Sequence, residues 1–120
     1  MPAGDLDDKF SQFREHWQPK VVASLNGQEV KLAKILGEFP WHRHAEADEL
    51  FLCWRGRFRL EFRDHAVEMG PGDYHLVPRG VEHRPVAEAE AEIVLFEPAD
   101  VRNTGDVDDA CFTAPQGVVL

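Results

Sequence analysis

The sequence predicts an all-β fold, with antiparallel strands arranged as a sandwich or a barrel. From residue 20 onward, short strand-like runs recur every 8–12 residues, and glycine and proline turn signals separate them. One run alternates cleanly, because Phe58, Leu60 and Phe62 face one side of a strand while charged residues face the other. The 120 residues suit a single domain with one core.

The first expected strands form a hairpin. Val21–Leu25 and Gln28–Leu32 flank Asn26-Gly27, a pair that tolerates positive φ at both central positions of a two-residue turn. Beyond the hairpin and the alternating run, the expected strands are Leu50–Trp54, Tyr74–Val77, His83–Ala87 and Ile93–Glu97.

Three further turns are expected between these strands. Arg63-Asp64-His65 reads as a turn, and Pro71-Gly72 suits a type II turn with glycine at the positive-φ position. Pro78-Arg79-Gly80 suits a type I turn with glycine at its last position.

The two ends of the chain differ from the middle. Leu6, Phe10, Phe13 and Trp17 recur at helical spacing, which predicts a short helix that stops before Pro19 and docks on a sheet or on a partner subunit. Residues 99–110 are polar and acidic, so we expect an extended loop, with Phe112 and residues 118–120 packing back on the barrel or a neighbour. The chain thus divides into an arm (1–19), a barrel (20–98) and a tail (99–120).

The composition excludes several classes of partner. A net charge of −9 argues against binding to nucleic acid or to an anionic membrane surface, because both require lysine and arginine. No apolar run approaches the roughly 18 residues of a membrane-spanning helix. The acidic N-terminus lacks the features of a secretory signal, so we expect a cytoplasmic protein.

The two cysteines, Cys53 and Cys111, cannot form a disulfide framework and include no CxxC pair. Cys53 lies inside an apolar run, so we interpret it as a small buried hydrophobic residue rather than a reactive thiol.

Four residues are candidate metal ligands. His42 and His44 are two positions apart, so on a strand both imidazoles would project from one face. Glu49 opens the next strand and His83 follows the turn at residues 78–80. Imidazoles with a carboxylate suit Fe, Mn, Ni, Cu or Zn, and two histidines with one carboxylate are the ligands of non-haem iron sites.

Spacing alone leaves other residues in competition. Glu46 and Asp48 are rivals of Glu49 for the carboxylate position. Among the other histidines, His16 and His65 are expected to be solvated. His75 is expected outside the pocket, although a one-residue slip of its strand would reverse its face.

Two longer patterns carry a resemblance to a known family. The stretch from Gly37 through His42-Arg-His44 and Glu49 to Gly56 resembles the first cupin motif, G(X)5HXH(X)3,4E(X)6G, with a first spacer of four residues instead of five. The stretch from Gly72 through Pro78-Arg-Gly80 to His83 resembles the second motif, G(X)5PXG(X)2H(X)3N. Ala87 stands where that motif has asparagine.

The resemblance covers roughly residues 30–98 and implies a small cupin: a six- to eight-stranded jelly-roll barrel (double-stranded β-helix) holding one metal ion. It implies His42, His44, Glu49 and His83 as the ligands, with coordination positions left for water or substrate. Small cupins are commonly homodimers, and the apolar N-terminal segment would suit a dimer contact. Many similar chains are described as mannose-6-phosphate isomerase-like, a label that rests on fold.

The expected function is metal-dependent chemistry on a small oxygenated molecule, either as a sugar-type isomerase or lyase or as a dioxygenase. A different reading is a non-catalytic binding module, in which the metal holds a ligand or braces the barrel. The expected lining of the pocket is mostly apolar. Its expected members are Phe51, Cys53, Phe58, Leu60 and Phe62.

Overall fold

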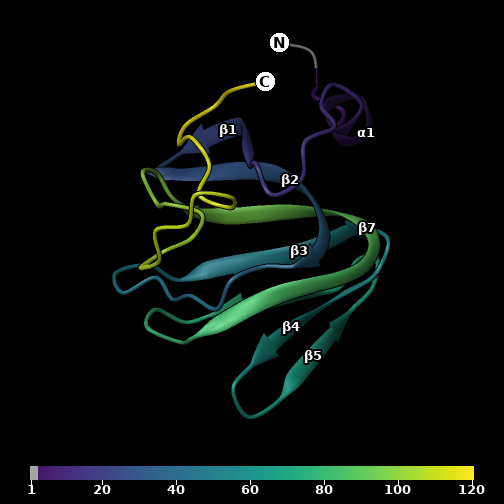
Figure 1. Ribbon diagram of the computed structural model, residues 1–120. Coiled ribbons are helices and arrows are strands. Elements are labelled where there is room, and N and C mark those ends of the chain that lie inside the picture. Colours follow the sequence, from purple (N-terminus) through teal and green to yellow (C-terminus); the bar gives the residue numbers. More distant parts are fainter. Residues whose placement is uncertain (1–2) are drawn as a thin grey trace.

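The structure, a computed structural model, describes residues 3–120 and is a jelly-roll of antiparallel strands with a short N-terminal helix (Figure 1). Residues 1 and 2 of the predicted arm lie outside the described part. The elements in chain order are α1 (Leu6–Phe10), β1 (Lys20–Leu25), β2 (Gln28–Glu38), β3 (Glu49–Arg55), β4 (Phe58–Phe62), β5 (Ala66–Met69), β6 (Tyr74–Val77) and β7 (His83–Pro98).

The long strand β7 organises the barrel. The sheet runs β1-β2-β7-β3-β6, and β4 pairs with both β5 and β7. The first part of β7 pairs with β4, with Pro85 opposite Leu60, and its last part pairs with β3, with Ile93 opposite Cys53. Figure 1 shows β7 bending between these two partners, so the sheet curls around one interior.

The strand prediction was wrong at three places. The two strands expected at His83–Ala87 and Ile93–Glu97 are one, because the alternating Ala and Glu residues between them contain no glycine or proline that would turn the chain. Strand β2 continues to Glu38, well past the expected end at Leu32. The short strand β5 was not expected at all.

The turns largely follow prediction. Asn26 and Gly27 both have positive φ, at 51° and 77°. Gly72 has a φ of 89° within a turn closed by the Asp73 amide and the Gly70 carbonyl. The turn at Pro78 differs, because the Val81 amide donates to the Pro78 carbonyl. Gly80, with a φ of 79°, is therefore the third residue of that turn and not the last.

Alternating residues of the strands fill the barrel interior. Phe58, Leu60 and Phe62 all point inward, as the alternation predicts, and Leu60 is fully buried. Cys53 is also fully buried, and its thiol lies 3.3 Å from the Gly56 carbonyl oxygen. Burial raises the pKa of the Cys53 thiol, which agrees with the inert role expected for it.

The N-terminal helix is shorter than predicted. It begins after Asp5, whose carboxylate accepts from the Asp8 amide, and it ends at Phe10 instead of continuing to Pro19. Trp17 is not helical because its backbone bonds to the sheet. Its amide donates to the Lys34 carbonyl, and its φ is 64°. The Trp17 indole also donates to the Leu36 carbonyl, at 3.0 Å.

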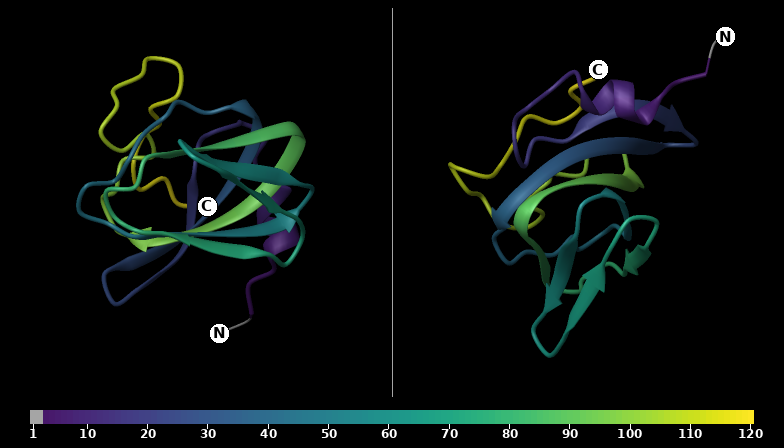
Figure 2. Two further views of the ribbon diagram at one scale, coloured as in Figure 1. Left: turned by 90° about the horizontal axis from the view of Figure 1, so that it is seen from below. Right: turned by 90° about the vertical axis from the view of Figure 1, so that its right-hand side faces the viewer.

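Both ends of the chain pack on the barrel (Figure 2). Phe10 and Phe13 bury Leu32 on the outer side of the sheet. The tail returns to β1, where the Val21 amide donates to the Val118 carbonyl at 2.7 Å, and Phe112 packs on Trp17. The tail therefore packs back on the barrel as expected. Within residues 3–120, no helix is long and apolar enough to cross a membrane.

Candidate functional site

The first two candidate ligands come from an irregular segment. Residues 39–48 do not form a strand, contrary to the expectation for His42 and His44. A pair of backbone hydrogen bonds between His42 and His83, at 2.9 and 3.0 Å, nevertheless ties this segment to the start of β7. Glu49 begins β3, so three separate parts of the chain meet at one point inside the barrel.

The structure brings all four predicted residues together as a cluster that could hold a metal ion. One ligand atom from each of His42, His44, Glu49 and His83 lies within 4.8 Å of the others, and all four residues are buried. The Oε1 atom of Glu49 lies 3.2 Å from Nε2 of His44 and 3.4 Å from Nε2 of His83. We call these residues the His/Glu cluster.

The backbone orients two of the imidazoles. Nδ1 of His42 lies 2.9 Å from the Pro40 carbonyl oxygen, and Nδ1 of His83 lies 2.8 Å from the Val81 carbonyl oxygen. A carbonyl only accepts hydrogen bonds, so each Nδ1 carries the proton and each Nε2 keeps a free lone pair. This is the arrangement in which a histidine binds a metal through Nε2 while its other nitrogen is held by a hydrogen bond.

The unsatisfied atoms of the cluster fit a cation. Among the described residues, Nε2 of His44, Nε2 of His83 and Oε1 of Glu49 are buried without a hydrogen-bond partner. Unpaired buried polar atoms cost free energy, and each such atom in a native fold calls for an explanation. A divalent metal ion would satisfy all three at once, because each presents a lone pair.

The protonation states of the cluster favour the binding of a metal ion. Burial, together with the neighbouring His83, lowers the pKa of His42 to about 4, so this imidazole is neutral at physiological pH. Burial alone would raise the pKa of Glu49, but the adjacent imidazoles of His44 and His83 hold it well below its usual range. A metal ion needs these protonation states, a neutral imidazole and an ionised carboxylate.

The rivals of Glu49 lie outside the cluster. Glu46 is exposed, and Asp48 accepts from the Arg79 amide at 2.8 Å. Of these three carboxylates, Glu49 alone belongs to the His/Glu cluster in the described part of the chain.

The remaining histidines also lie elsewhere. His65 is exposed beside Asp64, as expected, whereas His16 is only partly exposed and pairs with Glu90 at 2.7 Å. His75 packs near Phe62, outside the His/Glu cluster, as expected.

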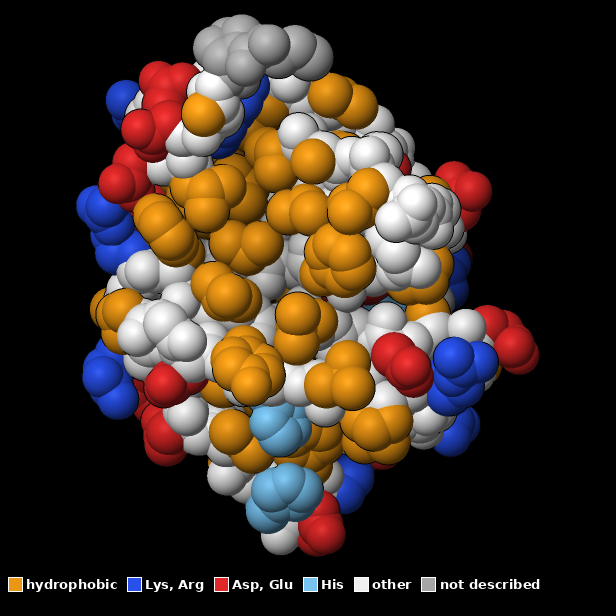
Figure 3. Space-filling view, turned by 180° about the vertical axis from the view of Figure 1, so that it is seen from behind, with side chains coloured by type: hydrophobic (Ala, Val, Ile, Leu, Met, Phe, Trp, Pro, Cys, Tyr) orange, Lys and Arg blue, Asp and Glu red, His pale blue; other side chains and the backbone are white. Residues whose placement is uncertain are grey.

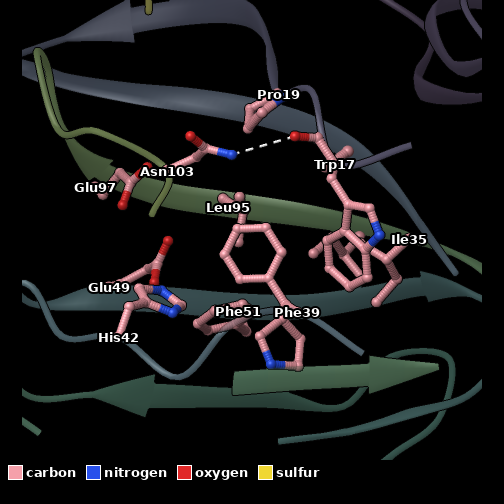
Figure 4. Close-up of a pocket in the computed structure, with 13 residues that line it drawn as sticks. Trp17, Pro19, Ile35, Phe39, His42, Glu49, Phe51, Leu95, Glu97 and Asn103 are labelled. Carbon is pink, nitrogen blue, oxygen red and sulfur yellow. Dashed lines mark hydrogen bonds between the residues drawn. The ribbon is translucent and has the colours of Figure 1, made fainter. Parts of the chain in front are cut away.

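A pocket opens beside the cluster (Figure 4). Of the five residues expected to line it, only Phe51 does; Cys53, Phe58, Leu60 and Phe62 pack in the core instead. The alternation placed them correctly on the inner face, but it could not say which end of the barrel stays open. The observed lining is Trp17, Pro19, Ala33, Ile35, Phe39, His42, Glu49, Phe51, Pro85, Ile93, Leu95, Glu97 and Asn103.

Sequence reasoning missed a second carboxylate in this pocket. Glu97 is only 2% exposed, and its Oε1 accepts from Nζ of the buried Lys31 at 3.0 Å. Burial and the adjacent Glu49 charge raise the pKa of Glu97 well above its usual range. The signal was available, because strand alternation places Glu97 on the same face as Ile93 and Leu95.

Three further lining residues, Trp17, Pro19 and Asn103, come from outside the predicted barrel. The Asn103 amide donates to the Trp17 carbonyl at 3.2 Å (Figure 4) and to the Phe112 carbonyl at 2.8 Å. Its Oδ1 accepts from the Ala114 amide. These bonds join the arm and the tail at the mouth of the pocket, and no local sequence pattern predicts them.

Comparisons with known proteins agree with this architecture. Residues 22–99 match the cupin domain. The chain is 31% identical over 106 residues to the uncharacterized protein YdbB of Bacillus subtilis, covering 79% of this chain and 88% of YdbB.

Two solved structures are similar as well. A cupin-2 domain containing protein from Shewanella frigidimarina is 42% identical with a TM-score of 0.79, covering 80% of this chain and 94% of that one. Protein NMB1881 from Neisseria meningitidis is 28% identical with a TM-score of 0.74, covering 82% of this chain and 100% of that one.

Proposed function

This chain belongs to the cupin domain family, and on that premise we propose that it is a metal-dependent enzyme acting on a small oxygenated molecule. The observation that carries the proposal is the His/Glu cluster, whose buried and unsatisfied ligand atoms adjoin a pocket. A site built only to brace the barrel would not need an adjoining cavity. The proposed ligands are His42, His44, Glu49 and His83, and the proposed metal is one divalent ion of Fe, Mn, Ni, Zn or Cu.

The protein's own residues set what such a site can do. Bound there, the metal would supply a Lewis acid for a carbonyl or hydroxyl oxygen of the substrate. The Pro40 and Val81 carbonyls fix the rings of His42 and His83, so the ligand geometry is preorganised. Apolar walls around the cluster limit access of water and strengthen electrostatic interactions inside.

The first test is metal content. Protein purified without a histidine tag is expected to bind one divalent ion per chain, measured by elemental analysis after supplementation and desalting. The His42→Ala/His44→Ala variant should lose it, while the matched His16→Ala/His65→Ala variant should keep it. Equal metal content in both double variants would contradict the site assignment.

The second test separates catalysis from binding. Sugar-type isomerase or lyase activity and dioxygenase activity remain the two candidate reactions. A screen of sugars, uronates and catechol-like molecules with each metal, with and without O₂, is expected to give turnover that depends on the cluster. A ligand that binds without turnover under every metal would favour the alternative function, a non-catalytic binding module.

We further propose a homodimer formed through the outer face of β3 and β6. The arm, first considered for this role, buries Phe10 and Phe13 within its own chain. Tyr74 and Leu76 of β6 are 71% and 53% exposed and pair with Leu52 and Leu50 of β3. Figure 3 shows hydrophobic side chains gathered on the face opposite to that of Figure 1. Apolar surface concentrated on one face is typical of an interface.

Sedimentation should give twice the chain mass of 13.6 kDa. The Leu76→Asp variant should sediment with the mass of one chain. The control Leu25→Asp, at an exposed leucine of the β1–β2 hairpin, should keep the mass of two chains. A monomeric unmodified chain would refute the dimer. We also propose a cytoplasmic location, and the net charge of −9 supports the absence of a nucleic-acid partner or an anionic membrane partner.

A further inference from the structure

We propose that the pocket takes a small, uncharged molecule with an apolar body and a hydroxyl group, and that Glu97 holds this hydroxyl beside the His/Glu cluster. The inference deepens the proposed function and rests on it, since it names the class of substrate. It favours a ring or short aliphatic chain that bears oxygen over a sugar phosphate or a uronate.

The walls of the pocket define the body of the ligand. Nine of the thirteen lining residues are apolar, and the polar ones are His42, Glu49, Glu97 and Asn103. The Trp17 and Phe39 rings lie against each other with centroids 4.7 Å apart, and the Phe39 ring in turn lies 5.1 Å from that of His42 (Figure 4). A ligand whose far end is a polyol would leave hydroxyls unpaired against these walls, which costs affinity.

Charge limits the ligand further. No lysine or arginine lines the pocket in the described part of the chain. The buried cation nearest to it, Lys31, is already engaged by Glu97 at 3.0 Å and Glu29 at 3.6 Å. A phosphate or carboxylate on the far end of a ligand would therefore be buried without a counter-charge, which is strongly unfavourable.

Glu97 supplies the polar contact for the hydroxyl. Lys31 holds its Oε1, while its Oε2 is buried and has no hydrogen-bond partner among the described residues. Figure 4 shows the carboxyl groups of Glu97 and Glu49 on the same side of the pocket. A hydroxyl both donates and accepts, so it can pair with Glu97 whichever protonation state that group adopts.

Asn103 does not offer a competing contact. Its amide nitrogen and oxygen are engaged by Trp17, Phe112 and Ala114. The polar recognition of a ligand is therefore concentrated at the end where Glu97, Glu49 and His42 meet, and the rest of the pocket selects by shape and apolar contact.

A ligand series on the unmodified zinc-loaded protein tests the proposal by calorimetry. Phenol carries both features, toluene lacks the hydroxyl, and methanol lacks the body. Mannose 6-phosphate and galacturonate carry a distant charge. Phenol should bind at least about tenfold more tightly than each of the other four, in line with the loss of one buried hydrogen bond or of the apolar contacts. Equal or tighter binding of any of the four, or no binding of phenol, would overturn the proposal.

Substitutions assign the hydroxyl contact to Glu97. Glu97→Leu removes both carboxyl oxygens at a similar size, so it should weaken phenol about tenfold without weakening toluene. The control Glu92→Leu, on the same strand but outside the pocket, should change neither. A phenol affinity unaffected by Glu97→Leu would refute the assignment, and if that variant fails to fold, the phenol–toluene comparison decides. Metal content measured on each sample, with the series repeated on metal-free protein, shows whether a failure lies in the metal site or in the pocket.

Discussion

Protonation of His42 should destabilise the metal-free protein as the pH falls. His42 is 3% exposed, and its pKa is lowered from 6.5 to about 4, chiefly by burial. Below pH 6.5 His42 binds a proton in the unfolded chain but not in the folded chain. The stability that neutral His42 contributes is therefore fully present above pH 6.5 and is lost as the pH falls towards 4. The full effect is about 3 kcal/mol, and about 2.5 kcal/mol of it is lost by pH 4.5.

Urea unfolding in the presence of a chelator measures this loss. The free energy of unfolding would be compared at pH 7 and pH 4.5 for the unmodified chain, for His42→Gln and for the control His65→Gln, at an exposed histidine. The difference between the two pH values should be about 2 kcal/mol smaller in His42→Gln than in the other two proteins. If all three proteins lose stability equally, His42 does not exclude the proton and its surroundings are not as described.

Three other perturbations have defined outcomes. Lys31→Met leaves Glu97 unpaired and should lower the free energy of unfolding by about 3–5 kcal/mol, whereas adding Glu97→Gln should restore part of it in a urea double-mutant cycle. Gly105→Ala, at a φ of 57° and with its new Cβ against the Arg43 carbonyl, should lower the melting temperature more than Gly117→Ala, at a φ of 69° in open space. Chelation of a bound metal should lower the free energy of unfolding by about 2.7 kcal/mol, if the free metal concentration had been 100 times its Kd. The melting temperature should fall accordingly.

The candidate site was the most predictable part of the molecule, because its information is local. The His42/His44 spacing, the strand start at Glu49 and the turn before His83 each set the position of one side chain. Only the choice among Glu46, Asp48 and Glu49 needed either the family resemblance or the structure. The surprise is that residues 39–48 are irregular, so strand alternation does not orient the two imidazoles. Backbone hydrogen bonds of His42 to His83 and of His44 to Gly80 hold the segment instead.

The fold was predictable in class and less so in its elements. Alternation identified the inward face of β4, and turn residues marked most strand ends. The periodicity of the arm failed at Trp17, because hydrogen bonds to Lys34 and Leu36 of β2 outweigh the helical preference of a few apolar residues. The single long β7 was missed because a bend in a strand needs no turn residue.

The position of the pocket could not be read from the sequence, and this has a consequence for specificity within the family. The ligand cluster lies inside residues 22–99, which match the cupin domain, whereas Trp17 and Asn103 lie outside that range. Both close the same pocket, and their mutual hydrogen bond makes the arm and the tail one structural unit at its mouth. Chains that share the cluster can therefore differ in the ligand they admit, because part of the pocket lining comes from segments that the shared domain does not constrain.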